Sequence, residues 1–121
     1  MGRNIFIVTD RKNENAIGNS LLDGLLAVGF RRPNILMARN YQESITKLED
    51  ENIEVVICEE SITKWRELSR HFKTSINKLF ILIGERDDAL GDPDVDRCFC
   101  LKSIRHNSTE VCKIIKVMMN T

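Results

Sequence analysis

The sequence has no long apolar run and no excess of either charge. Its apolar runs extend to only about six residues, far short of the ~20 that a transmembrane helix needs. Its 18 basic and 18 acidic residues give a formal net charge of zero. Nothing in this balance favours nucleic acid or an anionic membrane surface as a partner. Internal repeats and low-complexity segments are also absent, so we expect an ordinary folded domain.

The length and the first residues set the expected domain organisation and location. With 121 residues, of which 42% are hydrophobic and 30% charged, the chain is expected to form one domain over residues 1–121. Residues 1–4 lead directly into an apolar run and show no signal peptide. We therefore expect a cytoplasmic protein.

Histidine is scarce, and neither of the two histidines lies at ligand spacing from the cysteines. Three of the four cysteines lie in or at the end of apolar runs, where cysteine behaves as a small hydrophobic residue. The four are Cys58, Cys98, Cys100 and Cys112. We expect no zinc site, and we expect free, buried thiols in a reducing compartment.

Five short apolar runs alternate with longer amphipathic stretches. The runs are β-branched or aromatic and nearly continuous, which is typical of strands buried on both faces. We expect strands at residues 4–9, 34–38, 54–58, 79–83 and 98–101. We expect helices at about 15–28, 41–51, 62–74 and 108–119. Ser61 is an obvious N-cap for the third helix, and Ser108 is a plausible N-cap for the last.

This alternation predicts an α/β fold with a five-stranded parallel sheet in the order 2-1-3-4-5 and helices on both faces. The interval from Gly84 to Val95 should hold a further helix. It contains two glycines, a proline and several acids, and it has almost no apolar stripe. We therefore expect the fourth helix to be short or absent.

Polar residues follow the predicted strands. Thr9 ends the first and Asp10 follows it, Glu59 follows the third, Gly84 the fourth and Lys102 the fifth. Because ligands collect beyond the carboxyl ends of the strands in an open α/β sheet, this edge is the candidate site. We predict that the two acids and the lysine converge, with the lysine amine within salt-bridge reach of a carboxylate.

These positions resemble the receiver domain of response regulators, and the resemblance extends over nearly the whole chain. In that family, two acids after the first strand hold magnesium, and an aspartate at the end of the third strand accepts a phosphoryl group. The resemblance implies that Glu59 takes the phospho-acceptor position, and that Asp10 and Glu59 are the magnesium ligands that are left. Phe99 and Lys102 match the aromatic residue and the lysine of the family's fifth strand.

The chain departs from the family pattern at four positions. Thr9 replaces an acid, Glu59 the acceptor aspartate, Gly84 a serine or threonine, and Ser103 a proline. A carboxylate that attacks a phosphoryl group needs a divalent cation and in-line geometry, where an error of about 1 Å costs about a hundredfold in rate. The departures imply a pseudo-receiver: a signalling and protein-interaction module, not an enzyme, without a cofactor and with weak or lost magnesium binding.

Two other functions remain open. The first is a true receiver that is phosphorylated on this or another acid. The second is a flavodoxin-like enzyme or cofactor carrier, but residues 9–15 contain one threonine and no glycine, unlike a flavin phosphate loop. Local alternatives also remain: Asp10 as a turn residue, Glu59 or Glu60 as a first-turn acid of the next helix, and Lys102 as a solvated lysine.

Two surfaces are candidates for protein partners. The third predicted helix carries a basic face, for which solvation is the favoured explanation and an acidic docking partner the alternative. Its residues are Lys64, Arg66, Arg70, His71 and Lys73. The last predicted helix has an apolar surface wider than one core stripe needs, which indicates either extra core burial or a homodimer or partner face. Its residues are Val111, Ile114, Ile115, Val117, Met118 and Met119.

Overall fold

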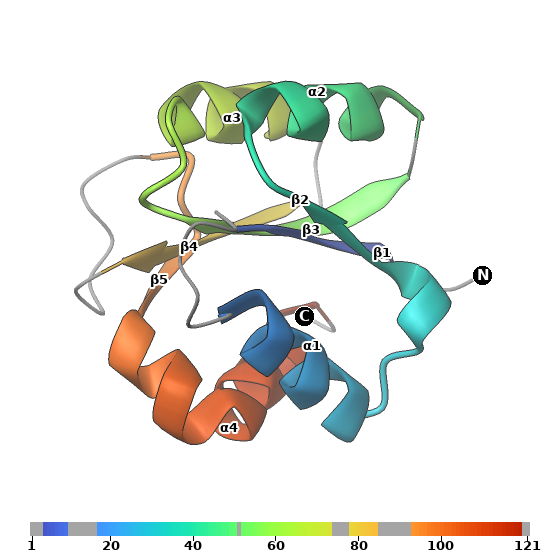
Figure 1. The fold of residues 1–121 in the computed structure, drawn as a ribbon, viewed down its shortest axis with the longest axis vertical. Coiled ribbons are helices and arrows are strands. Elements are labelled where there is room, and N and C mark those ends of the chain that lie inside the picture. The colour runs from blue at the N-terminus through green and yellow to red at the C-terminus, as the bar shows by residue number, and fades with distance from the viewer. Residues whose placement is uncertain (1–3, 10–16, 51, 74–77, 85–92, 120–121) are drawn as a thin grey trace.

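The computed structural model describes residues 4–9, 17–50, 52–73, 78–84 and 93–119, and these residues form five strands and four α-helices (Figure 1). The strands are β1 (Asn4–Val8), β2 (Ile35–Ala38), β3 (Ile53–Glu59), β4 (Leu79–Gly84) and β5 (Arg97–Cys100). The helices are α1 (Ile17–Ala27), α2 (Tyr41–Asp50), α3 (Trp65–Phe72) and α4 (Leu101–Met119), with a short 3-10 turn at Arg32–Asn34. None of the described helices combines the length and apolar character needed to cross a membrane.

The five strands form one parallel sheet in the order β2-β1-β3-β4-β5, as predicted. Figure 1 shows α2 and α3 on one face of the sheet and α1 and α4 on the other. No helix occurs among the described residues between β4 and β5, although residues 85–92 lie outside them. The predicted α/β fold is confirmed.

Alternate strand residues face two separate cores, which is why the runs are apolar at nearly every position. The α1/α4 core includes Ile5, Ile7, Ile17, Leu21, Leu25, Val55, Ile57, Ile81, Ile83, Phe99, Ile104, Val111, Cys112 and Ile115. The α2/α3 core includes Phe6, Val8, Ile53, Val56, Cys58, Ile62, Trp65, Leu68, Phe72, Phe80, Leu82, Val95 and Cys98. The sheet is therefore covered by apolar side chains on both faces.

The beginning of α3 differs from the prediction. The helix begins at Trp65 rather than near Ile62, and Ser61 is not its N-cap. The residue before the helix, Lys64, has left-handed backbone angles (φ 67°, ψ 25°) and gives no side-chain cap. Such a conformation costs an L-residue about 1–2 kcal/mol. The Lys64 ammonium lies 5.4 Å from the centre of the Tyr41 ring, which gives the strained residue one favourable contact.

The beginning of α4 also differs. The predicted start near Ser108 is instead a break inside a longer helix, where Asn107 has non-helical backbone angles (φ −140°, ψ 44°). The helix begins at Leu101, directly after β5, and Ile104 in its first segment is fully buried. The predicted last strand is displaced by one residue, because β5 begins at Arg97 and Leu101 belongs to α4.

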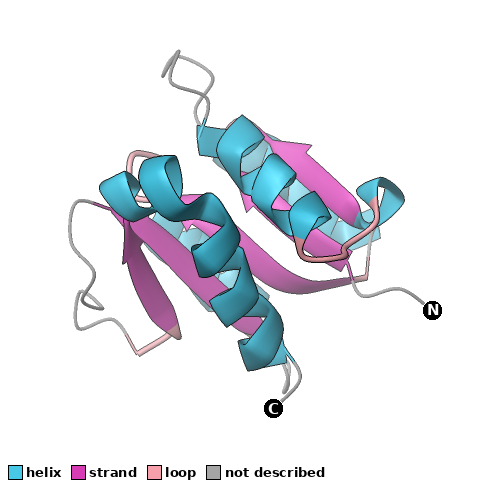
Figure 2. Ribbon diagram, turned by 90° about the horizontal axis from the view of Figure 1, so that it is seen from below, coloured by secondary structure: helices cyan, strands magenta, loops and turns pink. Residues whose placement is uncertain are grey.

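Helices α1 and α4 lie side by side on their face of the sheet (Figure 2). A Cβ on Gly24 would lie 2.8 Å from Cys112 Sγ and 2.9 Å from the Ser108 carbonyl oxygen, so the glycine permits this approach. The Cys112 thiol donates to the Leu21 carbonyl at 3.8 Å. Burial raises the pKa of the Cys112 thiol from 9.0 to about 12.

This buried thiol predicts a loss of stability in alkali. Between about pH 9 and about pH 12 the unfolded chain releases the Cys112 proton while the folded chain keeps it. We expect the free energy of unfolding to fall by about 1.4 kcal/mol per pH unit from this group once the pH exceeds 9. Urea unfolding at a series of alkaline pH values measures the slope. The slope of Cys112→Ala should be shallower by that amount, and parallel curves for the two proteins would contradict the prediction.

A polar cluster joins α3 to the amino ends of β4 and β5. The Asp96 carboxylate accepts hydrogen bonds from Lys73 Nζ at 2.7 Å and from the Phe80 backbone N–H at 2.8 Å. The Asp96 N–H in turn donates to the Phe80 carbonyl at 2.9 Å. Lys73 also donates to the Lys78 carbonyl at 2.8 Å. One carboxylate therefore fixes where the chain enters β5.

Candidate functional site

The strand register places Thr9, Glu59, Gly84 and Cys100 along the carboxyl edge of the sheet. Glu59 pairs with Ile83, and Gly84 pairs with Cys100. On the other side Thr9 continues β1, and its N–H donates to the Ala38 carbonyl at 3.0 Å. In the described part of the chain, the edge that the sequence predicts as the candidate site therefore includes these four residues.

Glu59 is the last residue of β3, and its side chain is only 3% exposed. The Ser61 hydroxyl donates to Glu59 Oε2 at 3.3 Å. The neighbouring Cys58 thiol has its pKa raised well above its usual range, first by burial and then by the negative charge of Glu59. Cys58 is therefore a protonated thiol within the core. The group at this position that is available for chemistry is the buried carboxylate of Glu59.

Thr9 is buried beside α1. It is 8% exposed, and a Cβ on Gly18 would lie 3.0 Å from its hydroxyl oxygen. The hydroxyl supplies no negative charge of the kind magnesium prefers in its ligands. Asp10 lies outside the described residues, so magnesium binding by Asp10 and Glu59 stays a prediction. No group of three or more metal-ligating side chains occurs among the described residues.

Glu60 makes a contact that the sequence did not predict. Its N–H donates to the Ile83 carbonyl at 2.7 Å, which continues the β3–β4 pairing by one residue. A Cβ on Gly84 would lie 2.5 Å from Glu60 Oε2 and 3.3 Å from its carboxyl carbon. The Glu60 carboxylate therefore lies against the Gly84 backbone, in space that any other residue at position 84 would use for its own side chain.

Phe99 and Lys102 occupy different environments. Phe99 is 4% exposed in the α1/α4 core, and the Arg97 guanidinium lies 5.0 Å from its ring centre. Lys102 is exposed in the first turn of α4, and the described carboxylates form no ion pair with it. The predicted convergence also involves Asp10, so it stays a prediction for the part of the edge outside the described residues.

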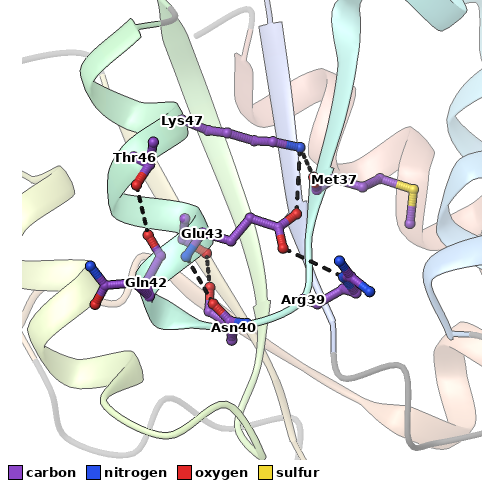
Figure 3. A network of polar contacts seen from close by, with 8 residues as sticks. Met37, Arg39, Asn40, Gln42, Glu43, Thr46 and Lys47 are labelled. Carbon is purple, nitrogen blue, oxygen red and sulfur yellow. Dashed lines mark hydrogen bonds and ion pairs between the residues drawn. The ribbon is translucent and has the colours of Figure 1, made fainter.

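The end of β2 carries a polar network of its own, seen in Figure 3. The Asn40 side chain accepts the Glu43 N–H at 2.8 Å, which caps the first turn of α2. The Glu43 carboxylate lies 3.5 Å from Arg39 Nε and 3.6 Å from Lys47 Nζ, and Lys47 donates to the Met37 carbonyl at 2.5 Å. These contacts attach α2 to β2, and we assign them a structural role.

The structure describes both surfaces that the sequence offers to partners, the basic face of α3 and the apolar surface of α4. On the basic face of α3, Lys73 is engaged by Asp96, and the Arg66 guanidinium lies 4.6 Å from the centre of the Trp65 ring. On α4, the structure assigns Val111, Ile115 and Met119 to the α1/α4 core. Two apolar side chains remain exposed there: Ile114 at 37% and Val117 at 64%.

A five-stranded parallel sheet in the order 2-1-3-4-5, with helices on both faces and acids at its carboxyl edge, is the flavodoxin-like fold of receiver domains. No model of a known protein family matches the sequence, and no curated protein matches it. Solved structures do match. A response regulator from Thermotoga maritima has a TM-score of 0.71 at 15% identity, over 98% of this chain and 99% of that chain.

Two further structures have the same likeness. A response regulator receiver modulated diguanylate cyclase from Pelobacter carbinolicus has a TM-score of 0.64 at 15% identity, over 97% of this chain and 92% of that chain. A chain in the complex of the P1 domain of CheA3 with CheY6 from R. sphaeroides has a TM-score of 0.62 at 13% identity, over all of both chains. At these identities the likeness shows that the chain has the receiver fold.

Proposed function

We propose that this chain is a receiver-like signalling module that binds a protein partner and is not phosphorylated in the usual way. The observation that carries the proposal is the burial of Glu59 at the end of β3, where the resemblance to receiver domains implies the phospho-acceptor. A nucleophile must reach its donor in line, and a side chain 3% exposed is poorly placed to do so.

The neighbours of Glu59 support the same function. The glutamate carboxylate extends about one bond further from the backbone than an aspartate, which displaces the attacking oxygen. Thr9 offers a hydroxyl against α1 where a magnesium ligand would carry charge. Gly84 has no hydroxyl to contact a phosphoryl group. We infer that metal binding by Asp10 and Glu59 is weak or lost, and that no enzymatic step takes place at this edge.

Partner binding supplies the output of such a domain. The matched complex contains CheY6 with the P1 domain of CheA3, so the receiver fold does bind a protein in that case. For this chain we propose a protein partner in signalling, bound through a fixed surface and regulated by the partner's concentration. A homodimer through the exposed Ile114 and Val117 of α4 is an alternative. A cytoplasmic location is a further proposal.

The test is incubation with acetyl phosphate and magnesium, followed by intact mass spectrometry. We expect the mass to stay unchanged, because Glu59 is buried and its surroundings lack what the transfer needs. A receiver domain with an aspartate acceptor, treated in parallel, should gain one phosphoryl group. A stable stoichiometric adduct on Glu59 or a neighbouring acid would instead establish a true receiver.

Restoring the two acids tests the explanation. The double variant Thr9→Asp/Glu59→Asp returns the family's acceptor and one more magnesium ligand to the edge. Some labelling of this variant would show that these two positions account for the loss of phosphotransfer. Labelling of the native chain at the same rate would show that they do not.

A further inference from the structure

The contact between Glu60 and Gly84 places a negative charge directly at the carboxyl edge. Glu60 is exposed overall, yet its Oε2 reaches within 2.5 Å of where a Cβ on Gly84 would be. The Glu60 N–H bond to the Ile83 carbonyl at 2.7 Å holds the backbone of this residue alongside β4. The backbone of Glu60 is therefore positioned by pairing, and the absence of a side chain at position 84 leaves room for its carboxylate.

The strand register also fixes which groups this carboxylate faces. Leu82 and Cys98 pair across β4 and β5 and belong to the α2/α3 core. Two residues later, Gly84 and Cys100 pair in the same way and share that face of the sheet. Cys100 is partly exposed, whereas Cys58, Cys98 and Cys112 are buried. The carboxylate on Gly84 thus stands next to the only partly exposed thiol of the described residues.

We propose that Glu60 is a specificity-determining residue that excludes anionic ligands from this edge of the sheet. A carboxylate resting on the Gly84 backbone occupies the space at the end of β4 and repels any negatively charged group that approaches Cys100 on this face of the sheet. This inference deepens the proposed function. Its consequence, that anionic phosphodonors are kept away from the edge, rests on that proposed function. The exclusion of anions itself is a property of the edge whether or not Glu59 accepts phosphate.

The chain contains a reporter for this property in Cys100. The Cys100 thiolate attacks both a dianionic aryl disulfide (DTNB), which releases thionitrobenzoate, and neutral iodoacetamide, which releases iodide. Only the first reagent is repelled by a nearby carboxylate. We expect Glu60→Gln to raise the ratio of the DTNB rate to the iodoacetamide rate at Cys100 about fivefold at low salt. The difference should shrink at high salt, where charges are screened. Peptide mass mapping identifies the modified cysteine.

Two variants control for charge and for position. Glu110→Gln removes the same charge from an exposed site on α4, 68% exposed, and should react like the native chain. Gly84→Ala places a Cβ where the Glu60 carboxylate lies, so it should expel the carboxylate and raise the ratio of the DTNB rate to the iodoacetamide rate. In a Glu60→Ala background, adding Gly84→Ala should leave this ratio unchanged, because no carboxylate remains to be expelled.

The outcomes separate the inference from its alternatives. Equal DTNB rates in the native chain and Glu60→Gln would overturn it, and so would a parallel rise in both reagents, which signals an opened structure. A second readout uses isotope-labelled protein without thiol reagents. Titration with inorganic phosphate should shift the amide NMR signals of Gly84 and Cys100 more in Glu60→Gln than in Glu110→Gln. Identical shifts would also overturn the inference. No phosphodonor is present in either assay, so failure here leaves the phosphorylation test untouched.

Discussion

Replacing Gly24 with valine is expected to lower the free energy of unfolding by about 3 kcal/mol. The new Cβ would lie 2.9 Å from the Ser108 carbonyl oxygen and 2.8 Å from Cys112 Sγ, so α1 and α4 would have to separate. A backbone carbonyl cannot rotate aside as a flexible side chain can. Urea unfolding followed by circular dichroism measures the loss as a lower midpoint.

The residue before Gly24 provides the matched control. Asp23 is exposed on the same helix, and aspartate and valine have similar helix propensities, so Asp23→Val should change stability by less than about 0.5 kcal/mol. Adding Cys112→Ala to Gly24→Val removes the sulfur contact but leaves the Ser108 contact, so recovery should be partial. If the two valine variants unfold at the same urea concentration, α1 and α4 do not approach as closely as described.

Replacing Asp96 with alanine is expected to lower the free energy of unfolding by about 2 kcal/mol. The change removes the acceptor of two hydrogen bonds, from Lys73 Nζ and from the Phe80 N–H, and leaves that backbone donor without its partner. The Lys73 and Asp96 side chains are 20% and 28% exposed, so solvent screens the pair only in part. Thermal and urea unfolding both report the loss.

A double-mutant cycle separates the two bonds of Asp96. Lys73→Met removes the ion pair and the bond to the Lys78 carbonyl, whereas the Phe80 N–H keeps its acceptor. The coupling between positions 73 and 96 then gives the contribution of the ion pair alone. Glu110→Ala is the comparison at the surface, since its pair with Lys113 is 59% and 68% exposed and should contribute almost nothing. Equal costs for Asp96→Ala and Glu110→Ala would contradict a role for Asp96 in fixing β5.

Apolar periodicity was sufficient to predict the sheet, because each strand is buried on both faces and therefore apolar at nearly every position. Helix starts were harder to predict. Ser61 looks like an N-cap, yet its hydroxyl bonds to the Glu59 carboxylate, and α3 begins only after the left-handed Lys64. Near Ser108 the sequence signal was real but marked a break at Asn107 rather than a beginning.

The candidate site was predictable in its strand ends and not in its contacts. Position along the chain placed Glu59 and Gly84 at one edge, since parallel strands end on the same side. The contact of Glu60 with Gly84 depends on which residues pair between β3 and β4, and apolar runs do not specify pairing to one residue. The one sequence signal for this contact is a glutamate, Glu60, that follows β3 and a glycine, Gly84, that ends β4.

The space on Gly84 also sets an order in which this domain can change by single substitutions. A hydroxyl residue at position 84 adds a Cβ in space that the Glu60 carboxylate now occupies, so Gly84→Ser in the native chain requires this exposed side chain to move. If Glu60→Ala comes first, the same serine enters a vacant space. The two positions are therefore epistatic, and a stepwise route toward the receiver pattern is smoother when position 60 changes before position 84.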